Sequence, residues 1–157
     1  MSAKLALALV LATLAAPLAA ETIADRPGWV VIKTAKPYQQ LIDAVKAAAK
    51  ANKLGVVTEA GPTKVAANRG ITIPGNRVIG LFNNDFAVKI LATSTAAMIE
   101  APVRVYVTQN SDGGATLSYK TPSMVFAPYL DEGGDALSEL AQGLDARFDA
   151  VAKAATQ

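Results

Sequence analysis

The chain has 157 residues, with 15 lysines and arginines against 13 aspartates and glutamates and a formal net charge of +2. The basic residues are spread out, so composition gives no general attraction to nucleic acid or to an anionic membrane. The sequence has no cysteine and no histidine, which excludes disulfides, catalytic thiols, Cys/His zinc sites and a Ser-His-Asp triad. General acid–base chemistry would fall to Asp, Glu, Tyr or Lys, whose ordinary pKa values lie far from neutrality.

The N-terminus has the pattern of a secretory signal peptide over residues 1–20. Lys4 supplies one positive charge, Leu5–Ala16 is almost purely apolar, and small residues lead to Ala20. The apolar run is shorter than the roughly twenty residues that a membrane span needs. We therefore expect cleavage after Ala20, one domain over residues 21–157, a periplasmic or secreted location and no stable membrane anchor.

The first half of the predicted domain alternates strands and helices. Trp29–Thr34 is rich in the β-branched and aromatic residues typical of strands. Residues 38–52 carry one apolar stripe at helical spacing. A second strand is expected over 54–59, a short helix over 63–69, and a continuous apolar strand over 78–82, of the kind that is buried on both faces.

A helix is predicted directly after that third strand. Asn83 or Asn84 can cap it, with Asp85 in its first turn and Ile90 and Leu91 on its inner face. Crevices at strand ends bind ligands in α/β folds, and helix N-termini favour anions, so Asn83 is also a candidate ligand contact.

Two alternating segments, 103–109 and 115–120, predict a β-hairpin. A three-residue loop at 111–113 pairs Val107 with Leu117 and keeps the apolar side chains on one face. That loop puts its glycine at the left-handed position that three-residue hairpins favour.

The polar face of the hairpin is a candidate ligand site. In this register Arg104 faces Lys120 and Tyr106 faces Ser118. Like charges across a strand pair repel, and the pair can persist where an anion, or an acid from another subunit, lies between them. The alternative is two long side chains that extend into water. We therefore consider Arg104, Tyr106, Ser118 and Lys120 as contacts for a small anionic ligand.

The segment from Met124 to Leu130 is apolar without being a good strand. Loops are normally polar, so this segment must cover the domain's own sheet or contact a partner. Met124, Phe126 and Tyr129 are the candidate interface residues. The sheet also has a second apolar face that a symmetric homodimer would cover.

The last helix is predicted over residues 135–153, after a break at Gly133-Gly134. The order strand, helix, strand, short helix, strand, helix, hairpin, helix indicates an α/β (α+β) fold. We expect a mixed sheet of about five strands with helices packed mainly on one face.

Four short motifs occur in a fixed order: Val78–Asn83, Ala101–Val107, the turn at Asp112-Gly113 and Ser118–Pro122. Over roughly residues 55–122 they resemble the domain-of-unknown-function family 302. The resemblance implies a small α/β domain and a homodimer, with no agreed activity.

Two positions depart from the family pattern. Many members have cysteines where this chain has Phe82 and Val103. A thiol or metal role at those sites therefore does not carry over, and both positions are expected to belong to the core.

Three hypotheses for function follow. The first is a non-catalytic, homodimeric binding module for a small molecule or another envelope protein, without a cofactor. The second is an enzyme that uses carboxylate, Tyr or Lys chemistry, with Asp85 and Tyr106 as catalytic candidates. The third is haem or metal binding through Tyr or Met, residue types that more commonly fill the core. The residues considered for it are Tyr38, Tyr106, Tyr119, Tyr129, Met98 and Met124.

Overall fold

The computed structural model describes residues 23–157. The predicted signal peptide, residues 1–20, lies outside the described residues. Within residues 23–157, no helix is long and apolar enough to cross a membrane.

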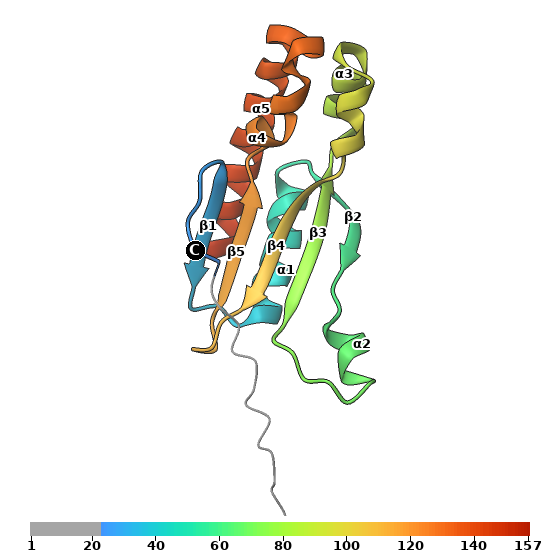
Figure 1. The fold of residues 1–157 in the computed structure, drawn as a ribbon. Coiled ribbons are helices and arrows are strands. Elements are labelled where there is room, and N and C mark those ends of the chain that lie inside the picture. The colour runs from blue at the N-terminus through green and yellow to red at the C-terminus, as the bar shows by residue number, and fades with distance from the viewer. Residues whose placement is uncertain (1–22) are drawn as a thin grey trace, which may run out of the picture.

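Five strands form one sheet in the order β1-β5-β4-β3-β2 (Figure 1). Their bounds are β1 Trp29–Thr34, β2 Gly55–Ala60, β3 Asn76–Phe82, β4 Val103–Gln109 and β5 Ala115–Lys120. Every neighbouring pair is antiparallel, whereas the sequence predicted a mixed sheet. The reason is the long connection through the first helix, which carries the chain from one edge of the sheet to the other. The strands β1 and β2 run in the same direction but never become neighbours.

The helices pack mainly on one face of the sheet, as predicted. Helix α1 and the C-terminal half of α5 lie behind the sheet in Figure 1, while α3, α4 and the start of α5 extend beyond one end of it. The other face, here called the open face, carries no helix from residues 23–157. The helices are α1 Tyr38–Ala51, α2 Thr63–Ala67, α3 Asn84–Thr93, α4 Pro122–Phe126 and α5 Leu130–Thr156, with 3-10 turns η1 Ala96–Glu100 and η2 Ala127–Tyr129.

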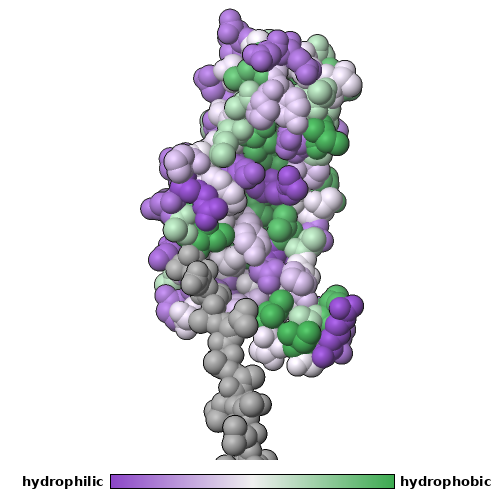
Figure 2. Space-filling model, in the orientation of Figure 1, coloured by the Kyte–Doolittle hydropathy of each residue, from purple (hydrophilic) through white to green (hydrophobic). Residues whose placement is uncertain are grey.

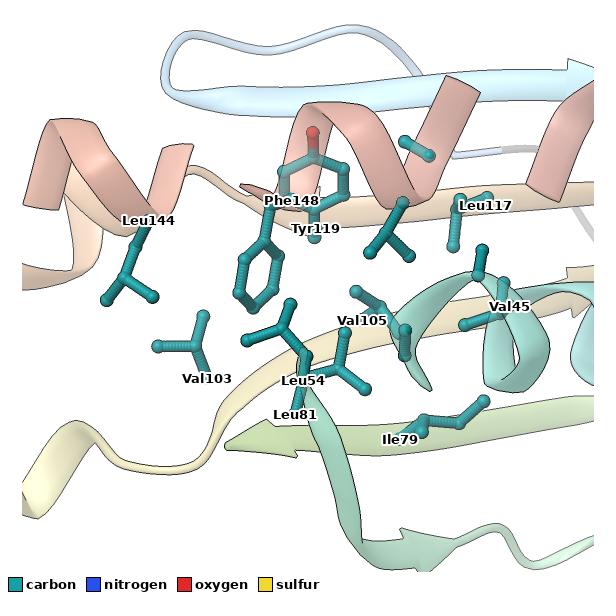
Figure 3. Packing of buried hydrophobic residues seen from close by; sticks show 14 of the residues in the cluster. Val45, Leu54, Ile79, Leu81, Val103, Val105, Leu117, Tyr119, Leu144 and Phe148 are labelled. Carbon is teal, nitrogen blue, oxygen red and sulfur yellow. The ribbon is translucent and has the colours of Figure 1, made fainter. Parts of the chain in front are cut away.

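The two faces of the sheet differ in polarity. The open face shows a mixture of hydrophilic and hydrophobic side chains (Figure 2). The covered face carries the core, where Val45 of α1, Val105 of β4 and Leu117 of β5 are all fully buried (Figure 3). Phe148 of α5 packs its ring 5.5 Å from that of Tyr119. Burying one such large side chain stabilises the fold by roughly 1.5–3 kcal/mol, so the α5 contact anchors the helical layer.

The β4–β5 hairpin has the predicted register. Val107 pairs with Leu117, and Tyr106 pairs with Ser118. Gly113 has a φ of 88°, the left-handed conformation that the three-residue loop requires. The strict alternation therefore buries one set of side chains and turns the other to the open face.

The segment predicted as an apolar loop is instead helix α4 followed by η2. Thr121 caps α4, because its hydroxyl accepts a hydrogen bond from the Met124 amide at 3.2 Å, and Pro122 occupies the first turn. The helix turns Phe126 into the core, where it is 1% exposed. Phe126 is therefore not an interface residue as predicted. Met124 remains exposed and Tyr129 half-buried.

The ends of two helices also differ from expectation. Helix α5 begins at Leu130 rather than at residue 135, but Gly134 within it has the non-helical angles φ 56° and ψ −151°, so the predicted break is present. In α3, Leu91 is half-exposed rather than buried. Helix α3 extends beyond the end of the sheet, so part of its apolar side has no layer to pack against.

An ionic cluster joins α1, β2 and β3 at the edge of the sheet. The carboxylate of Glu59 lies 2.5 Å from Lys46 Nζ and 3.2 Å from an Arg77 guanidinium nitrogen. The hydrogen bond from Lys46 is the main cause that holds the pKa of Glu59 below its ordinary value of 4.5.

Replacing Glu59 by Gln is expected to lower the free energy of unfolding near pH 7 by less than about 1 kcal/mol, the usual range for partly exposed ion pairs. Because the folded state depresses the pKa of this carboxyl group, its contribution is complete above pH 4.5 and is lost as the pH falls below that value. Urea unfolding of wild type and Glu59→Gln should therefore differ at pH 7, and the difference should shrink as the pH falls below 4.5. A difference that persists unchanged at pH 3 would contradict this account.

Candidate functional site

Cross-strand pairing arranges the side chains of the open face in rows. Arg104 of β4 is paired with Gly80, and extending the β4–β5 register by one residue sets it opposite Lys120, which pairs with Trp29. We call Trp29, Lys120 and Arg104 the cationic row. The next row, the tyrosine row, consists of Val31, Ser118, Tyr106, Val78 and Ala60.

A pocket of about 520 Å³ lies on the open face over these two rows. Its volume falls within the usual range for small-molecule sites. Both rows contribute to its lining, and Glu100 of η1 and Val125 of α4 border it as well. Gly61 and Pro62, which connect β2 to α2, line it from the far edge of the sheet.

Two cations stand side by side in this pocket. Arg104 and Lys120 are both exposed, and neither forms an ion pair with any residue in 23–157. Lys120 Nζ lies 5.8 Å from the centroid of the Trp29 ring, and the guanidinium carbon of Arg26 lies 5.1 Å from that centroid. These cation–π contacts bring two positive groups to the indole, but they supply no negative charge to balance Arg104.

The tyrosine row has a buried hydroxyl without a partner. Ser118 is fully buried, and its Oγ forms no hydrogen bond with the residues that the structure describes. Beside it, burial and the neighbouring Tyr38 raise the pKa of Tyr106, so the Tyr106 phenol stays protonated near neutrality and can donate a hydrogen bond.

Glu100 contributes the one carboxylate of the pocket lining. Its Oε1 accepts a hydrogen bond from the Tyr129 hydroxyl at 2.8 Å, and this bond is the main cause that raises the pKa of Tyr129. The Tyr129 hydroxyl is therefore already engaged in a hydrogen bond within its own chain.

Four of the five predicted ligand contacts line this one pocket, namely Arg104, Tyr106, Ser118 and Lys120. The fifth, Asn83, does not. Its Oδ1 accepts a hydrogen bond from the Phe86 amide at 3.1 Å, and its Nδ2 donates to the Lys53 carbonyl at 2.8 Å. Both ends of the side chain are engaged in capping α3 and fixing the turn before β2, which is why Asn83 is not a ligand contact here.

The two catalytic candidates do not share a site. Asp85 lies in the first turn of α3 and does not line the pocket to which Tyr106 belongs. No group of three or more Asp or Glu side chains within residues 23–157 is arranged to hold a metal ion. Met98 packs against the core, and burial raises the pKa of Tyr119 to about 12.

Phe82 and Val103, where many family members have cysteine, border a second and much smaller hollow of about 20 Å³ near α3 and α5. Val103 is buried, whereas Phe82 is half-buried. Val103 belongs to the buried core as expected, whereas Phe82 lies outside the core cluster, so the expectation for Phe82 was wrong.

Sequence reasoning missed Trp29, Glu100 and Pro62 as lining residues. The alternation of residues 29–34 was visible, but the pairing of β1 with β5 was not. Without that pairing, nothing in the sequence brings Trp29 beside Lys120.

The architecture, a one-sided α+β sandwich with an open antiparallel face, is that of a known family. The family model described as "Domain of unknown function DUF302" matches residues 30–155, and the chain belongs to this family. The match extends well beyond the residues 55–122 that the sequence motifs indicated.

A solved structure shares the fold. It is the crystal structure of an uncharacterized conserved DUF302 protein from Bacillus stearothermophilus, with a TM-score of 0.73 and 16% sequence identity, covering 84% of this chain and 100% of that one. At this identity the likeness concerns the fold alone. No curated protein matches the chain.

The stability of a Ser118 variant tests whether the Ser118 hydroxyl is without a hydrogen bond in solution. Because Ser118 Oγ is buried without a hydrogen bond, replacing it by Ala is expected to leave the free energy of unfolding unchanged or raise it by up to about 1 kcal/mol. Chemical denaturation of wild type and Ser118→Ala, without added ligand, measures this. A loss of stability above about 1 kcal/mol would mean that the hydroxyl is hydrogen-bonded in solution.

Proposed function

We propose that this chain is an exported, non-catalytic binding module that holds a small anionic molecule in the open-face pocket. The proposal rests mainly on one observation, the adjacent Arg104 and Lys120 at a pocket of ligand size, without an ion-pair partner among residues 23–157. Export is proposed from the N-terminal pattern of charge and hydrophobicity.

An anion relieves the repulsion between these two cations. They stand on neighbouring strands, which are about 4.8 Å apart, and like charges directly opposite each other destabilise a strand pair. A carboxylate between them would form charge-assisted hydrogen bonds, each worth about 1.5–3 kcal/mol. Binding therefore converts an unfavourable pair into a favourable one.

The neighbouring groups complete such a site. The Tyr106 hydroxyl can donate a further hydrogen bond, and the Trp29 ring offers a flat apolar wall. Ser118, the cross-strand partner of Tyr106, also belongs to the pocket lining, and its Oγ has no hydrogen-bond partner among residues 23–157.

The expected test is a thermal-shift screen against small carboxylates, phosphates and sulfonates. A ligand at one hundred times its Kd stabilises the folded protein by about 2.7 kcal/mol, which raises the melting temperature by several degrees. The shift should shrink strongly in Arg104→Ala and Lys120→Ala. Lys89→Ala, which removes an exposed cation of α3 outside the pocket, is the matched control and should keep the full shift. Equal shifts in all variants, or no shift with any anion, would refute the proposed site.

Homodimer formation stays a prediction, and we keep it as part of the proposal. Two surfaces were predicted for it. The segment 124–130 is reduced, because Phe126 is buried and only Met124 and part of Tyr129 remain accessible. The open face of the sheet, the second predicted surface, is assigned in this proposal to the ligand and not to the partner chain. Light scattering on the purified protein is expected to give about twice the mass of one chain. Met124→Lys should then lower the dimer fraction, because it would place a charge in an apolar contact. A strict monomer would end this part of the proposal.

A further inference from the structure

The two ends of the open-face pocket differ in chemistry. Arg104 on β4 and Lys120 on β5 form its cationic end, whereas Val78 on β3, Ala60 on β2 and Pro62 form the opposite end. Two strand spacings, about 10 Å, separate β4 from β2. The charged end and the apolar end of the pocket are therefore separated by about the length of one small molecule.

The charge of the lining suits a ligand with a single negative charge. Arg104 and Lys120 contribute two positive charges, and Glu100 contributes one negative charge, which leaves +1. A monoanion would balance this charge. A dianion such as a phosphate monoester would leave a surplus negative charge in a pocket whose lining also contains Glu100.

The apolar end offers few hydrogen bonds to a ligand. Asn76 is the polar side chain of the lining at this end, and its Nδ2 already donates to Thr63 Oγ1 at 3.3 Å and to the Pro74 carbonyl at 3.1 Å, which leaves its Oδ1 as an acceptor. Several hydroxyl groups of a sugar or nucleoside buried against Val78 and Pro62 would exceed this one side-chain acceptor, which is costly. An apolar ligand body meets no such penalty there.

We infer that the open-face pocket, given the anion-binding role proposed above, takes a monoanionic organic acid with an apolar body, an aromatic or medium-chain aliphatic carboxylate. The carboxylate lies between Arg104 and Lys120, with the Tyr106 hydroxyl as a further donor. The apolar body extends across the tyrosine row over Val78 towards Ala60 and Pro62, with Trp29 as the wall at the charged end.

Isothermal titration of the purified protein with four probes tests this inference. The probes are 2-naphthoate, acetate, inorganic phosphate and 2-naphthalenemethanol, which separate the apolar body from the charge. We expect saturable binding of one 2-naphthoate per chain, with the other three at least tenfold weaker. Arg104→Ala should weaken 2-naphthoate binding about tenfold by removing a charge-assisted contact.

A variant at the apolar end tests whether an apolar ligand body binds there. Val78→Thr keeps the β-branched shape but adds a hydroxyl, and should weaken 2-naphthoate binding about fivefold, somewhat less than a change in a closed hydrophobic pocket produces. The matched control is Val88→Thr, the same change at an exposed residue of α3 outside the pocket. It should leave binding unchanged.

The outcomes distinguish this inference from the proposed function. Acetate or phosphate that binds as tightly as 2-naphthoate, in a way that depends on Arg104, would overturn the ligand class and leave the anion site standing. Equal binding of 2-naphthalenemethanol, or no effect of Val78→Thr, would also overturn the ligand class. Failure of every anion to bind would overturn both.

Discussion

In the described part of the chain, helices cover only one face of the sheet, and the rest of the structure depends on this one-sided layering. The α1 and α5 layer buries one set of alternating residues from β4 and β5, including Val105 and Leu117. Successive side chains along a strand point to opposite faces of the sheet, so the residues that alternate with this buried set point to the open face. Arg104, Tyr106 and Lys120 therefore gather on one surface as a consequence of how the core is formed.

The sequence predicted correctly those features of the structure that depend on neighbouring residues alone. The hairpin register follows from alternation and from the glycine turn, and the Asn83 cap follows from the preference of Asn for helix N-termini. The order of the strands was not predictable, because it depends on where long connections return to the sheet. The sequence therefore identified Arg104 and Lys120 but not their neighbour Trp29. Phe126 was misjudged because its prolines argued against a strand, and a short capped helix was not considered.

The pocket shows how an α+β domain without cysteine or histidine can still have a defined chemical character. Its groups are of two kinds, fixed cations at one end and apolar side chains at the other. Groups of this kind bind and orient a molecule, whereas acid–base chemistry near neutrality needs a shifted carboxyl, lysine or tyrosine pKa. In the pocket lining the two resolved shifts, those of Tyr106 and Tyr119, both move the tyrosine pKa further from neutrality, which fits binding better than proton transfer.

Single-cysteine labelling along β4 tests the one-sided layering most directly, since the natural chain has no cysteine. Cysteines introduced one at a time at positions 104 to 108 would be reacted with a maleimide under native conditions. The account predicts fast labelling at 104, intermediate labelling at 106 and 108, and protection at 105 and 107. Protection at 104 and 106 as strong as at 105 and 107 would show that the open face is covered in solution and would contradict the account.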